Sequence, residues 1–305
     1  MVGNSRCSEL TNIGNKMNYK ESKLRTETIK SYFEVLKQDS RNIKVPNLIG
    51  LGSPRCGTST LYKLLSDRDD CYCSPVKEAN FWGIKQEGYN RDGWTVEEYK
   101  RLFLGGETFK YNADITPVYL HCIDSLEEIR KNTNDVKVII NIRNPIDRLF
   151  SQFKHFSEIG RSRMRHDFNN DEFELFLTEG IKKFKENKVK IRDWSCPGKA
   201  ITQSLYNDYI LKCEELFGQE NVLVLLYEDL KVSQDIWQQT LNDFLGDELS
   251  GLESQTSIFH ANKSKVMEMN LEQETLSELF DIFDKDIEPL SKTIGRDLAS
   301  IWKII

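Results

Sequence analysis

Long apolar runs are absent from this chain of 305 residues. A membrane-spanning helix needs about 20 consecutive apolar residues, and no such stretch occurs. The first 44 residues are polar and show no signal-peptide pattern. We therefore expect no membrane partner and a cytoplasmic location.

Metal-ligand and disulfide patterns are also missing. The chain has only four histidines, and its seven cysteines form no pair or cluster with the spacing of a metal site. An odd number of cysteines without a framework is typical of free thiols in a reducing compartment. We expect neither a bound metal nor disulfide bonds.

An excess of positive charge is absent as well, because the formal net charge is −6. This balance argues against nucleic acid as a general partner. Basic residues do gather in 161–192. That stretch is either a solvated helix face or a binding site for an anionic acceptor, and the solvated face is the simpler interpretation.

The most informative segment that is present runs from Leu48 to Leu61. An apolar stretch leads into a loop of small residues that contains Gly52 and Gly57, and an amphipathic segment follows. Glycine permits close approach of the backbone to a ligand, and a helix N-terminus favours an anion. The pattern predicts a strand, a phosphate-sized loop and a helix, although an ordinary strand–helix turn remains the alternative.

This loop resembles a Walker A loop but departs from it at one position. Gly52 and Gly57 have the Walker spacing, but Thr58 stands where the lysine belongs. The positive charge is supplied earlier, by Arg55. The loop therefore fits a nucleotide with a phosphate or sulfate at its 5′ end better than it fits magnesium-dependent hydrolysis of a nucleoside triphosphate.

A second predicted strand, 136–142, ends beside another arginine. Arg143 follows the strand, Pro145 is placed to open a helix, and Ser151 lies on that helix. In an open α/β sheet, ligands bind beyond the carboxyl ends of the strands. Two such ends with one arginine each indicate a ligand that carries two separated anionic groups.

The ordered set of these segments resembles the sulfotransferases that use 3′-phosphoadenosine-5′-phosphosulfate (PAPS). The similarity is greatest to the branch of heparan sulfate N- and 3-O-sulfotransferases and its bacterial relatives, including cyanobacterial natural-product enzymes. It covers about residues 45–303. It is carried by the segments 50–61, 77–82, 114–119, 142–151, 204–206 and 262–265.

The resemblance implies roles for individual residues. The 5′-phosphosulfate would be held by the first loop, the 3′-phosphate by Arg143 and Ser151, and the nucleotide would lie near Tyr206. A late loop would close over the phosphates. The implied donor-binding residues are Arg55, Cys56, Gly57, Thr58, Ser59, Thr60, Arg143, Ser151, Tyr206, Lys263 and Lys265. The product would be adenosine 3′,5′-bisphosphate (PAP), and no metal is implied.

The resemblance also places Glu78 where the glycan branch has its catalytic base. Sulfuryl transfer needs positioned cations around the sulfate and a base for the acceptor proton. Arg55 supplies the cation and Glu78 is the first candidate for the base, with Asp114, His155 and His121 behind it. Each of these could instead be structural: a solvated loop acid, a turn cap or a satisfied histidine.

Three departures from the family pattern concern the cation and the acceptor. Arg55 replaces the lysine usual in animal enzymes, Ile115 replaces a lysine of the 3-O branch, and Asn80 replaces an expected histidine. We predict transfer to a hydroxyl or amine of a small polar acceptor, such as a bacterial saxitoxin-type alkaloid. The alternatives are a polysaccharide acceptor, or a P-loop-like kinase or nucleotide-binding module. Acceptor contacts are assigned to Phe81, Trp82 and Trp94, which could instead be core packing.

The organisation predicted from these patterns is α/β, a single domain with a central parallel sheet and helices on both faces. Residues 1–44 form a polar extension with one amphipathic helix over 18–38, and 45–305 form the sulfotransferase domain. Residues 84–112 are predicted to be a substrate lid. The predicted strands are 45–51, 136–142 and 221–227, and the predicted helices are 58–67, 145–157, 171–187, 203–217, 233–245, 271–287 and 288–303. The sequence gives no indication of oligomeric state.

Overall fold

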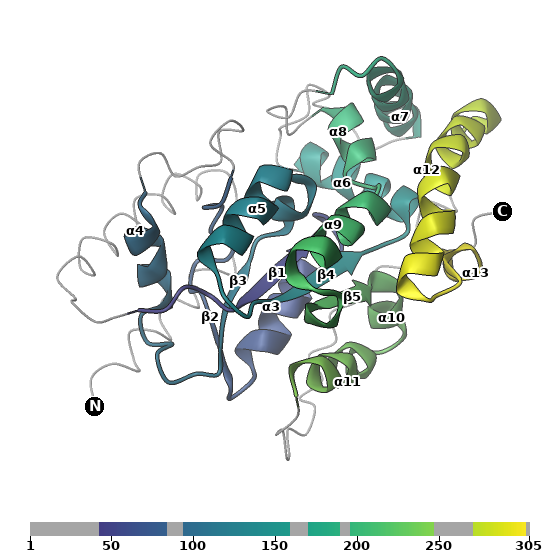
Figure 1. Cartoon of the computed structure of the whole chain (residues 1–305). Helices are drawn as coiled ribbons and strands as arrows, with labels where there is room; N and C mark the ends of the chain where they lie inside the picture. The colour runs from purple at the N-terminus through teal and green to yellow at the C-terminus, as the bar shows by residue number, and fades with distance from the viewer. Residues whose placement is uncertain (1–42, 84–93, 159–169, 190–195, 247–270, 303–305) are drawn as a thin grey trace. The chain divides into compact units, whose positions relative to one another are not determined.

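A computed structural model describes residues 43–83, 94–158, 170–189, 196–246 and 271–302 of the chain (Figure 1). The predicted helix over 18–38 and the predicted phosphate ligands Lys263 and Lys265 lie outside these residues. The same holds for parts of the predicted lid and of the basic stretch 161–192.

Five strands form one sheet in the order β2-β3-β1-β4-β5. The strands are β1 (Leu48–Gly52), β2 (Cys71–Cys73), β3 (Tyr111–Ile115), β4 (Lys137–Ile142) and β5 (Val222–Leu226). The pairs β1–β3 and β2–β3 are parallel. With helices flanking the sheet, this confirms the predicted α/β domain with a central parallel sheet.

The contacts divide the chain into two compact units, and the boundary passes through strands β1 and β4 themselves. Unit 1 comprises residues up to Leu51 together with Thr58–Ile139, and unit 2 comprises Gly52–Gly57 and Ile140–Ile305. Both strands therefore give residues to each unit. The first predicted anion loop, up to Gly57, belongs to unit 2 together with Arg143 and Ser151.

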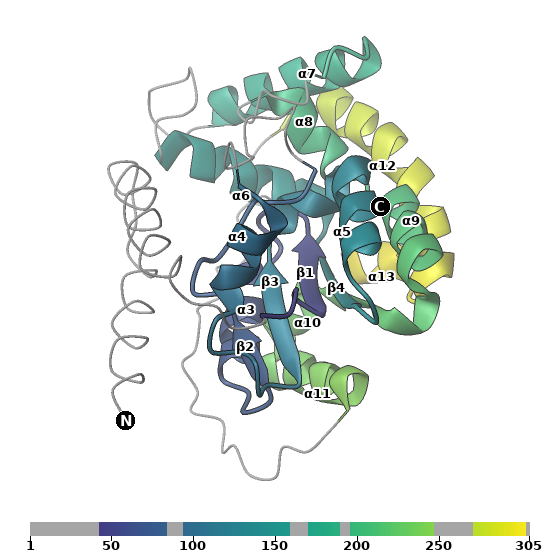
Figure 2. The ribbon, with the colours of Figure 1, turned by 60° about the vertical axis from the view of Figure 1, so that its left-hand side comes forward.

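Unit 1 is built around β3, which lies between β2 and β1 (Figure 2). Leu48 pairs with Ala113, and Ile49 pairs with Asp114. Helix α3 (Thr58–Ser66) buries Leu61, Leu64 and Leu65, and it packs on β2 and β3. The remaining elements are α4 (Val96–Lys100), η2 (Arg101–Phe103), η3 (Pro117–His121) and α5 (Ile123–Asn132).

Unit 2 is mostly helical. It contains α6 (Pro145–Glu158), α7 (Asn170–Lys185), α8 (Pro197–Thr202), α9 (Asn207–Phe217), η4 (Gln219–Asn221), α10 (Tyr227–Val232), α11 (Gln234–Leu245), α12 (Gln273–Ile294) and α13 (Leu298–Trp302). An aromatic cluster joins α6 to α7, where the rings of Phe150 and Phe153 lie 5.3 and 5.2 Å from that of Phe173. Helix α7 also packs on α8 and α12 (Figure 1).

Several predicted boundaries need correction. The helix predicted over 203–217 begins at Asn207, because the Asp286 carboxylate of α12 accepts the backbone N–H groups of Tyr206 and Asn207 there. The helices predicted over 271–287 and 288–303 were wrongly divided. Helix α12 continues through Pro289 and ends before Gly295, which takes a left-handed φ of 65°.

Two strands were not predicted. Strand β2 has only three residues, and β3 carries the polar residues Asn112 and Asp114, so neither shows a continuous apolar run. The predicted lid over 84–112 contains the regular elements α4 and η2 in its described part and ends in β3. Helix α10 was also missed, because the strand prediction extended over Tyr227.

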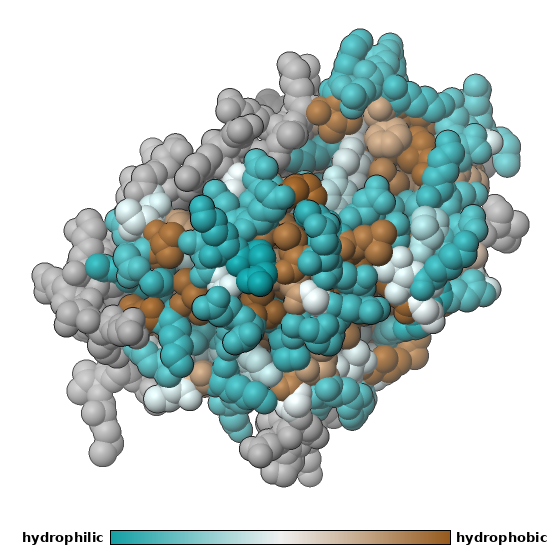
Figure 3. Space-filling model, viewed as in Figure 1, coloured by the Kyte–Doolittle hydropathy of each residue, from teal (hydrophilic) through white to brown (hydrophobic). Residues whose placement is uncertain are grey.

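Hydrophilic residues predominate over the described elements on the face drawn in Figure 3. None of the helices in the described ranges is long and apolar enough to cross a bilayer.

Candidate functional site

The loop after β1 takes a backbone shape that depends on its glycines. Gly52 has a φ of 145°, and a Cβ atom there would lie 2.9 Å from the backbone nitrogen and oxygen of Asn141. This close approach allows the Ser53 N–H to donate to the Asn141 carbonyl at 3.1 Å. Gly57 has a φ of 88°, and a Cβ atom there would meet the rings of Trp237 and Tyr227. Both ends of the loop are therefore packed closely against other residues of unit 2.

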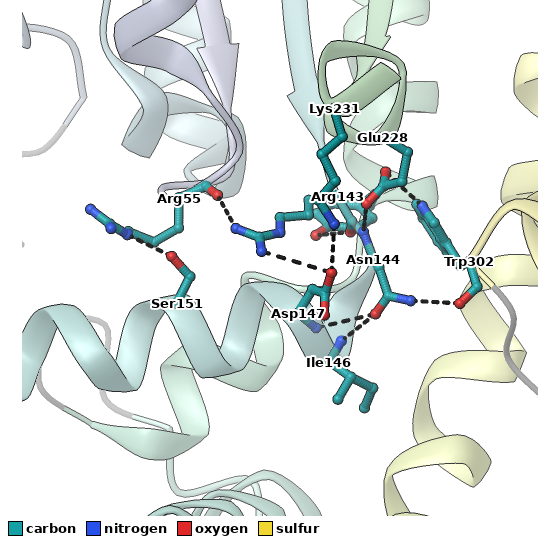
Figure 4. Close-up of polar contacts among 10 residues, drawn as sticks. Arg55, Arg143, Asn144, Ile146, Asp147, Ser151, Glu228, Lys231 and Trp302 are labelled. Carbon is teal, nitrogen blue, oxygen red and sulfur yellow. Dashed lines mark hydrogen bonds and ion pairs between the residues drawn. The ribbon is translucent and has the colours of Figure 1, made fainter. Parts of the chain in front are cut away.

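Arg55 occupies the centre of this loop in a left-handed conformation, with a φ of 75°. Its side chain is exposed, and its Nε donates to the Ser151 hydroxyl of α6 at 3.1 Å (Figure 4). The two residues were predicted to hold opposite ends of the donor. Their hydrogen bond places the loop and the first turns of α6 at one site.

Arg143, directly after β4, lies on the other side of the loop (Figure 4). Its Nη1 donates to the Arg55 carbonyl at 3.3 Å, and its guanidinium stacks on the Tyr227 ring at 4.4 Å. The side chain is 10% exposed. The buried Nε finds no hydrogen-bond partner among the described residues. A buried arginine with donor capacity left over fits an anion that approaches this side.

Asp147 balances the charge of Arg143 and of a second cation. Its Oδ2 lies 3.8 Å from Arg143 Nη2 and 2.8 Å from Lys231 Nζ of α10. Lys231 also lies 5.6 Å from the centre of the Tyr227 ring. Neither Lys231 nor Tyr227 was predicted to take part in this site. A role for Tyr227 could have been predicted from the sequence, because Tyr227 directly follows β5 and therefore lies at the carboxyl end of a third strand.

Arg148 is a third arginine of this site and is completely buried. Its guanidinium donates to the Ser204 hydroxyl at 2.8 Å and to the carbonyls of Pro54 and Ala200 at 3.0 and 2.5 Å. Burial lowers the pKa of its guanidinium, and none of its described hydrogen-bond acceptors is a carboxylate. Arg148 therefore brings uncompensated positive charge to the base of the loop while holding the Pro54 carbonyl.

Asn144 organises the start of α6. Its Oδ1 accepts the N–H groups of Ile146 and Asp147 at 2.9 and 3.2 Å, as an N-cap does. Its own N–H donates to Glu228 Oε1 at 3.1 Å, and Glu228 Oε2 accepts from the Trp302 indole at 2.9 Å (Figure 4). These bonds fix the helix that carries Ser151.

Two predicted donor-site residues, Cys56 and Tyr206, have no exposed surface. The thiol of Cys56 has no exposed surface, and burial raises its pKa to about 12. It is therefore a neutral side chain rather than a nucleophile at neutral pH. Tyr206 is also fully buried, and its hydroxyl donates to the Arg143 carbonyl at 2.9 Å. In this arrangement Tyr206 supports the arginine, and its predicted contact with the nucleotide stays a prediction.

The first residues of α3 were predicted to bind the 5′-phosphosulfate. Thr58 and Thr60 are 6% and 9% exposed, whereas Ser59 is exposed. They open a helix of nine residues whose first turn contains no acidic side chain. A helix start without nearby negative charge is compatible with an anion.

Glu78 lies in unit 1 on a turn that follows β2. Its N–H donates to the Ile115 carbonyl at 3.1 Å, and its carboxylate accepts from Lys77 Nζ at 2.8 Å. The side chain is 40% exposed. Its carboxylate is therefore accessible to solvent, as a base that takes a proton from an acceptor must be.

Asp114, a second candidate base, is fully buried in β3. It accepts hydrogen bonds from Tyr99 and Thr116, both at 2.7 Å, and from Tyr119 at 3.3 Å. Burial raises the pKa of this carboxyl group, and these hydrogen bonds oppose the rise. In this conformation Asp114 has no surface through which an acceptor could reach it.

The predicted acceptor contacts and the remaining candidate bases differ in how deeply they are buried. Phe81 and Trp82 are 8% and 1% exposed. Phe81 stacks on the Tyr99 ring at 4.4 Å and Trp82 meets that ring edge to face at 5.0 Å, which is core packing. Trp94, His155 and His121 are partly exposed. No group of histidine, cysteine and acidic side chains within the described ranges could hold a metal ion.

Comparison with known proteins identifies relatives of this chain. A family model described as "Sulfotransferase domain" matches residues 46–290. Carbohydrate sulfotransferase 15 of Mus musculus is 23% identical in an alignment 239 residues long that covers 61% of this chain and 41% of that protein. The Homo sapiens protein of the same name gives the same values. The chain thus spans less than half the length of these curated relatives.

Solved structures show the same fold. A sulfotransferase from Alicyclobacillus acidocaldarius is similar with a TM-score of 0.65 and 24% identity, covering 86% of this chain and 100% of that one. Sulfotransferase STF9 from Mycobacterium avium has a TM-score of 0.50 and 14% identity, covering 86% of this chain and 80% of that one. The family match covers more than half of the chain. It does not depend on the site geometry described above and is therefore separate support for a common family.

Proposed function

This chain belongs to the sulfotransferase family, and we propose that it transfers the sulfuryl group of PAPS to a hydroxyl or amine of a small polar acceptor. One observation carries the proposal: Arg55 and Arg143 meet in unit 2, where Arg143 donates to the Arg55 carbonyl and Arg55 to Ser151. These hydrogen bonds support the assignment of the two predicted anion-binding groups to one donor site. Members of the family use PAPS, whose two anionic ends suit such a pair.

Charge at this site supports donor binding. Arg55 is exposed, Arg143 has an unpartnered Nε, and Arg148 has only neutral acceptors among the described residues. Asp147 is the acid that contacts Arg143. A bound 3′-phosphate would complete the hydrogen bonds of Arg143 and Ser151, and a 5′-phosphosulfate would complete those of Arg55 and the loop amides.

Sulfuryl transfer requires no covalent intermediate with the protein, which has to position the reactants and stabilise charge. PAPS supplies the sulfuryl group, and transfer resembles phosphoryl transfer, with in-line attack and charge spread over the equatorial oxygens. Arg55 would stabilise that charge from a fixed position, because its backbone is held by the Arg143 hydrogen bond. Glu78, with its partly exposed carboxylate, would take the acceptor proton. Loss of a general base costs about 10²–10⁴ in rate.

The acceptor is the finer part of the proposal. Our first choice is a small natural product, with saxitoxin-type alkaloids as the class to test, and our second is a carbohydrate. The second is favoured by the curated relatives, which are named carbohydrate sulfotransferases. The proposed domain runs over 45–305, and the proposed location is the cytoplasm.

The deciding experiment has two stages. PAP should raise the melting temperature, because a ligand at about 100 times its Kd adds about 2.7 kcal/mol of stability. ATP with Mg²⁺ should have no comparable effect, since the Walker lysine is replaced by Thr58. A stronger shift with ATP would contradict the proposal and favour a kinase-like module. Acceptor panels of alkaloids, small alcohols, amines and polysaccharides are then incubated with PAPS and examined by mass spectrometry for an added SO₃.

A further inference from the structure

The turn that carries Glu78 is held in an unfavourable backbone conformation. Glu78 and Asn80 both have left-handed φ angles, 61° and 51°, although neither is glycine. Asparagine adopts this conformation comparatively readily, whereas for Glu78 it costs on the order of 1–3 kcal/mol and persists only where the surrounding structure holds it. The residue between them, Ala79, is completely buried. Contacts in unit 1 must therefore fix this turn.

The contacts that fix it converge on Asp114. A backbone hydrogen bond from Ala79 lowers the pKa of the Asp114 carboxyl group. The Tyr119 hydroxyl donates to Asp114 Oδ2 at 3.3 Å and accepts the Phe81 N–H at 2.6 Å. The Tyr99 hydroxyl donates to the same oxygen at 2.7 Å and accepts from the Trp82 indole at 3.1 Å. Each hydroxyl thus joins the carboxylate to the segment that follows Glu78.

Among the residues that the structure describes, the Asp114 carboxylate has no cationic partner to explain its burial. Its described partners are two tyrosine hydroxyls, the Thr116 hydroxyl and one backbone group, all of them neutral. A buried carboxylate is costly even when it is hydrogen-bonded. The hydrogen bonds that Asp114 accepts in exchange hold Ala79 and Phe81 in a fixed position. Asp114 itself has no exposed surface, whereas the Glu78 side chain is 40% exposed.

We propose that Asp114 is a positioning residue, which holds the turn 78–82 through Ala79, Tyr99 and Tyr119 and thereby sets the direction of the Glu78 carboxylate. The proposal rests on the proposed role of Glu78 as the base. A displacement of about 1 Å in a catalytic group can lower a rate by about 10²-fold. Asp114 therefore affects turnover without contact with the acceptor.

The test compares Asp114→Asn and Tyr119→Phe with a matched control. Tyr72→Phe is the control, because it also removes a tyrosine hydroxyl in unit 1, one that donates to the Leu104 carbonyl at 2.9 Å. We expect the first two variants to lose about 10- to 100-fold in kcat, with the Kd for PAP unchanged. The control should keep its kcat. Peptides spanning 77–83 should exchange amide hydrogen faster in the first two variants only.

A double variant separates positioning from direct proton transfer. If Asp114 acts through Glu78, Asp114→Asn combined with Glu78→Gln is no slower than Glu78→Gln alone. A further large loss in the double variant would make Asp114 an independent base and overturn the proposal. Unchanged kcat in both Asp114→Asn and Tyr119→Phe would also overturn it.

Failure of the proposed function gives a different experimental result from failure of the proposed role of Asp114. If the wild-type protein transfers no sulfuryl group to any acceptor, the proposed activity fails, but hydrogen exchange still tests the turn. Faster exchange at 77–83 in Asp114→Asn and Tyr119→Phe, and not in Tyr72→Phe, supports the role of Asp114 in holding the turn. Equal exchange in all three variants overturns it.

Discussion

Replacing Arg143 with alanine is expected to weaken PAP far more than it weakens AMP, which lacks the 3′-phosphate. The Arg143 side chain is 10% exposed, so solvent screens its charge only weakly. A hydrogen bond to a charged group contributes about 1.5–3 kcal/mol. At about 1.4 kcal/mol for each factor of ten, the Kd for PAP should rise about 10- to 100-fold. The Kd for AMP should change by less than about threefold.

Isothermal titration calorimetry at constant ionic strength measures both values. Arg143→Lys keeps the charge but loses the planar fork, so it should fall between wild type and Arg143→Ala. Arg130→Ala is the control for net charge, because Arg130 is an exposed residue of α5. An equal loss of affinity for PAP and AMP in Arg143→Ala would refute the assignment of Arg143 to the 3′-phosphate.

Three further outcomes are expected. Glu78→Gln should keep its PAP affinity in calorimetry and lose about 10²–10⁴ in kcat; an unchanged rate would exclude Glu78 as the base. Arg148→Ala should lower the free energy of unfolding by about 2–4 kcal/mol in urea titration, because it leaves a cavity at a fully buried position and removes the guanidinium that donates to the Pro54 carbonyl. Cys56, with its pKa raised to about 12, should resist iodoacetamide at pH 8 until the protein is unfolded; rapid labelling of the folded protein would contradict its burial.

Local sequence patterns were sufficient to predict the elements that carry the donor site. Strand β4 and helix α6 were predicted to within one residue, because a run of valine and isoleucine ends at Arg143 and Pro145 can open a helix. The association of Arg55 with Arg143 also followed from the sequence, since both come after strands expected to be parallel. The observed hydrogen bond between them agrees with that expectation.

What the sequence did not reveal depends on contacts between distant segments. The break before α9 is produced by Asp286, about 80 residues away. Strand β3 was missed because it carries buried polar residues, of which Asp114 accepts hydrogen bonds from two tyrosines of other segments, Tyr99 and Tyr119. A local pattern cannot show that a polar residue will find such partners.

Asp114 and Arg148 are a buried anion and a buried cation, and the same physical argument applies to both. Each is fully buried, and each is bound by neutral groups among the described residues. Buried charges of this kind rarely add stability compared with apolar residues of similar size, so their retention needs another cause. Each holds a backbone segment next to a candidate ligand or base: Arg148 holds the Pro54 carbonyl beside Arg55, and Asp114 holds Ala79 beside Glu78. We infer that this chain gives up stability at both places to fix the direction of a charged side chain that must act on a ligand.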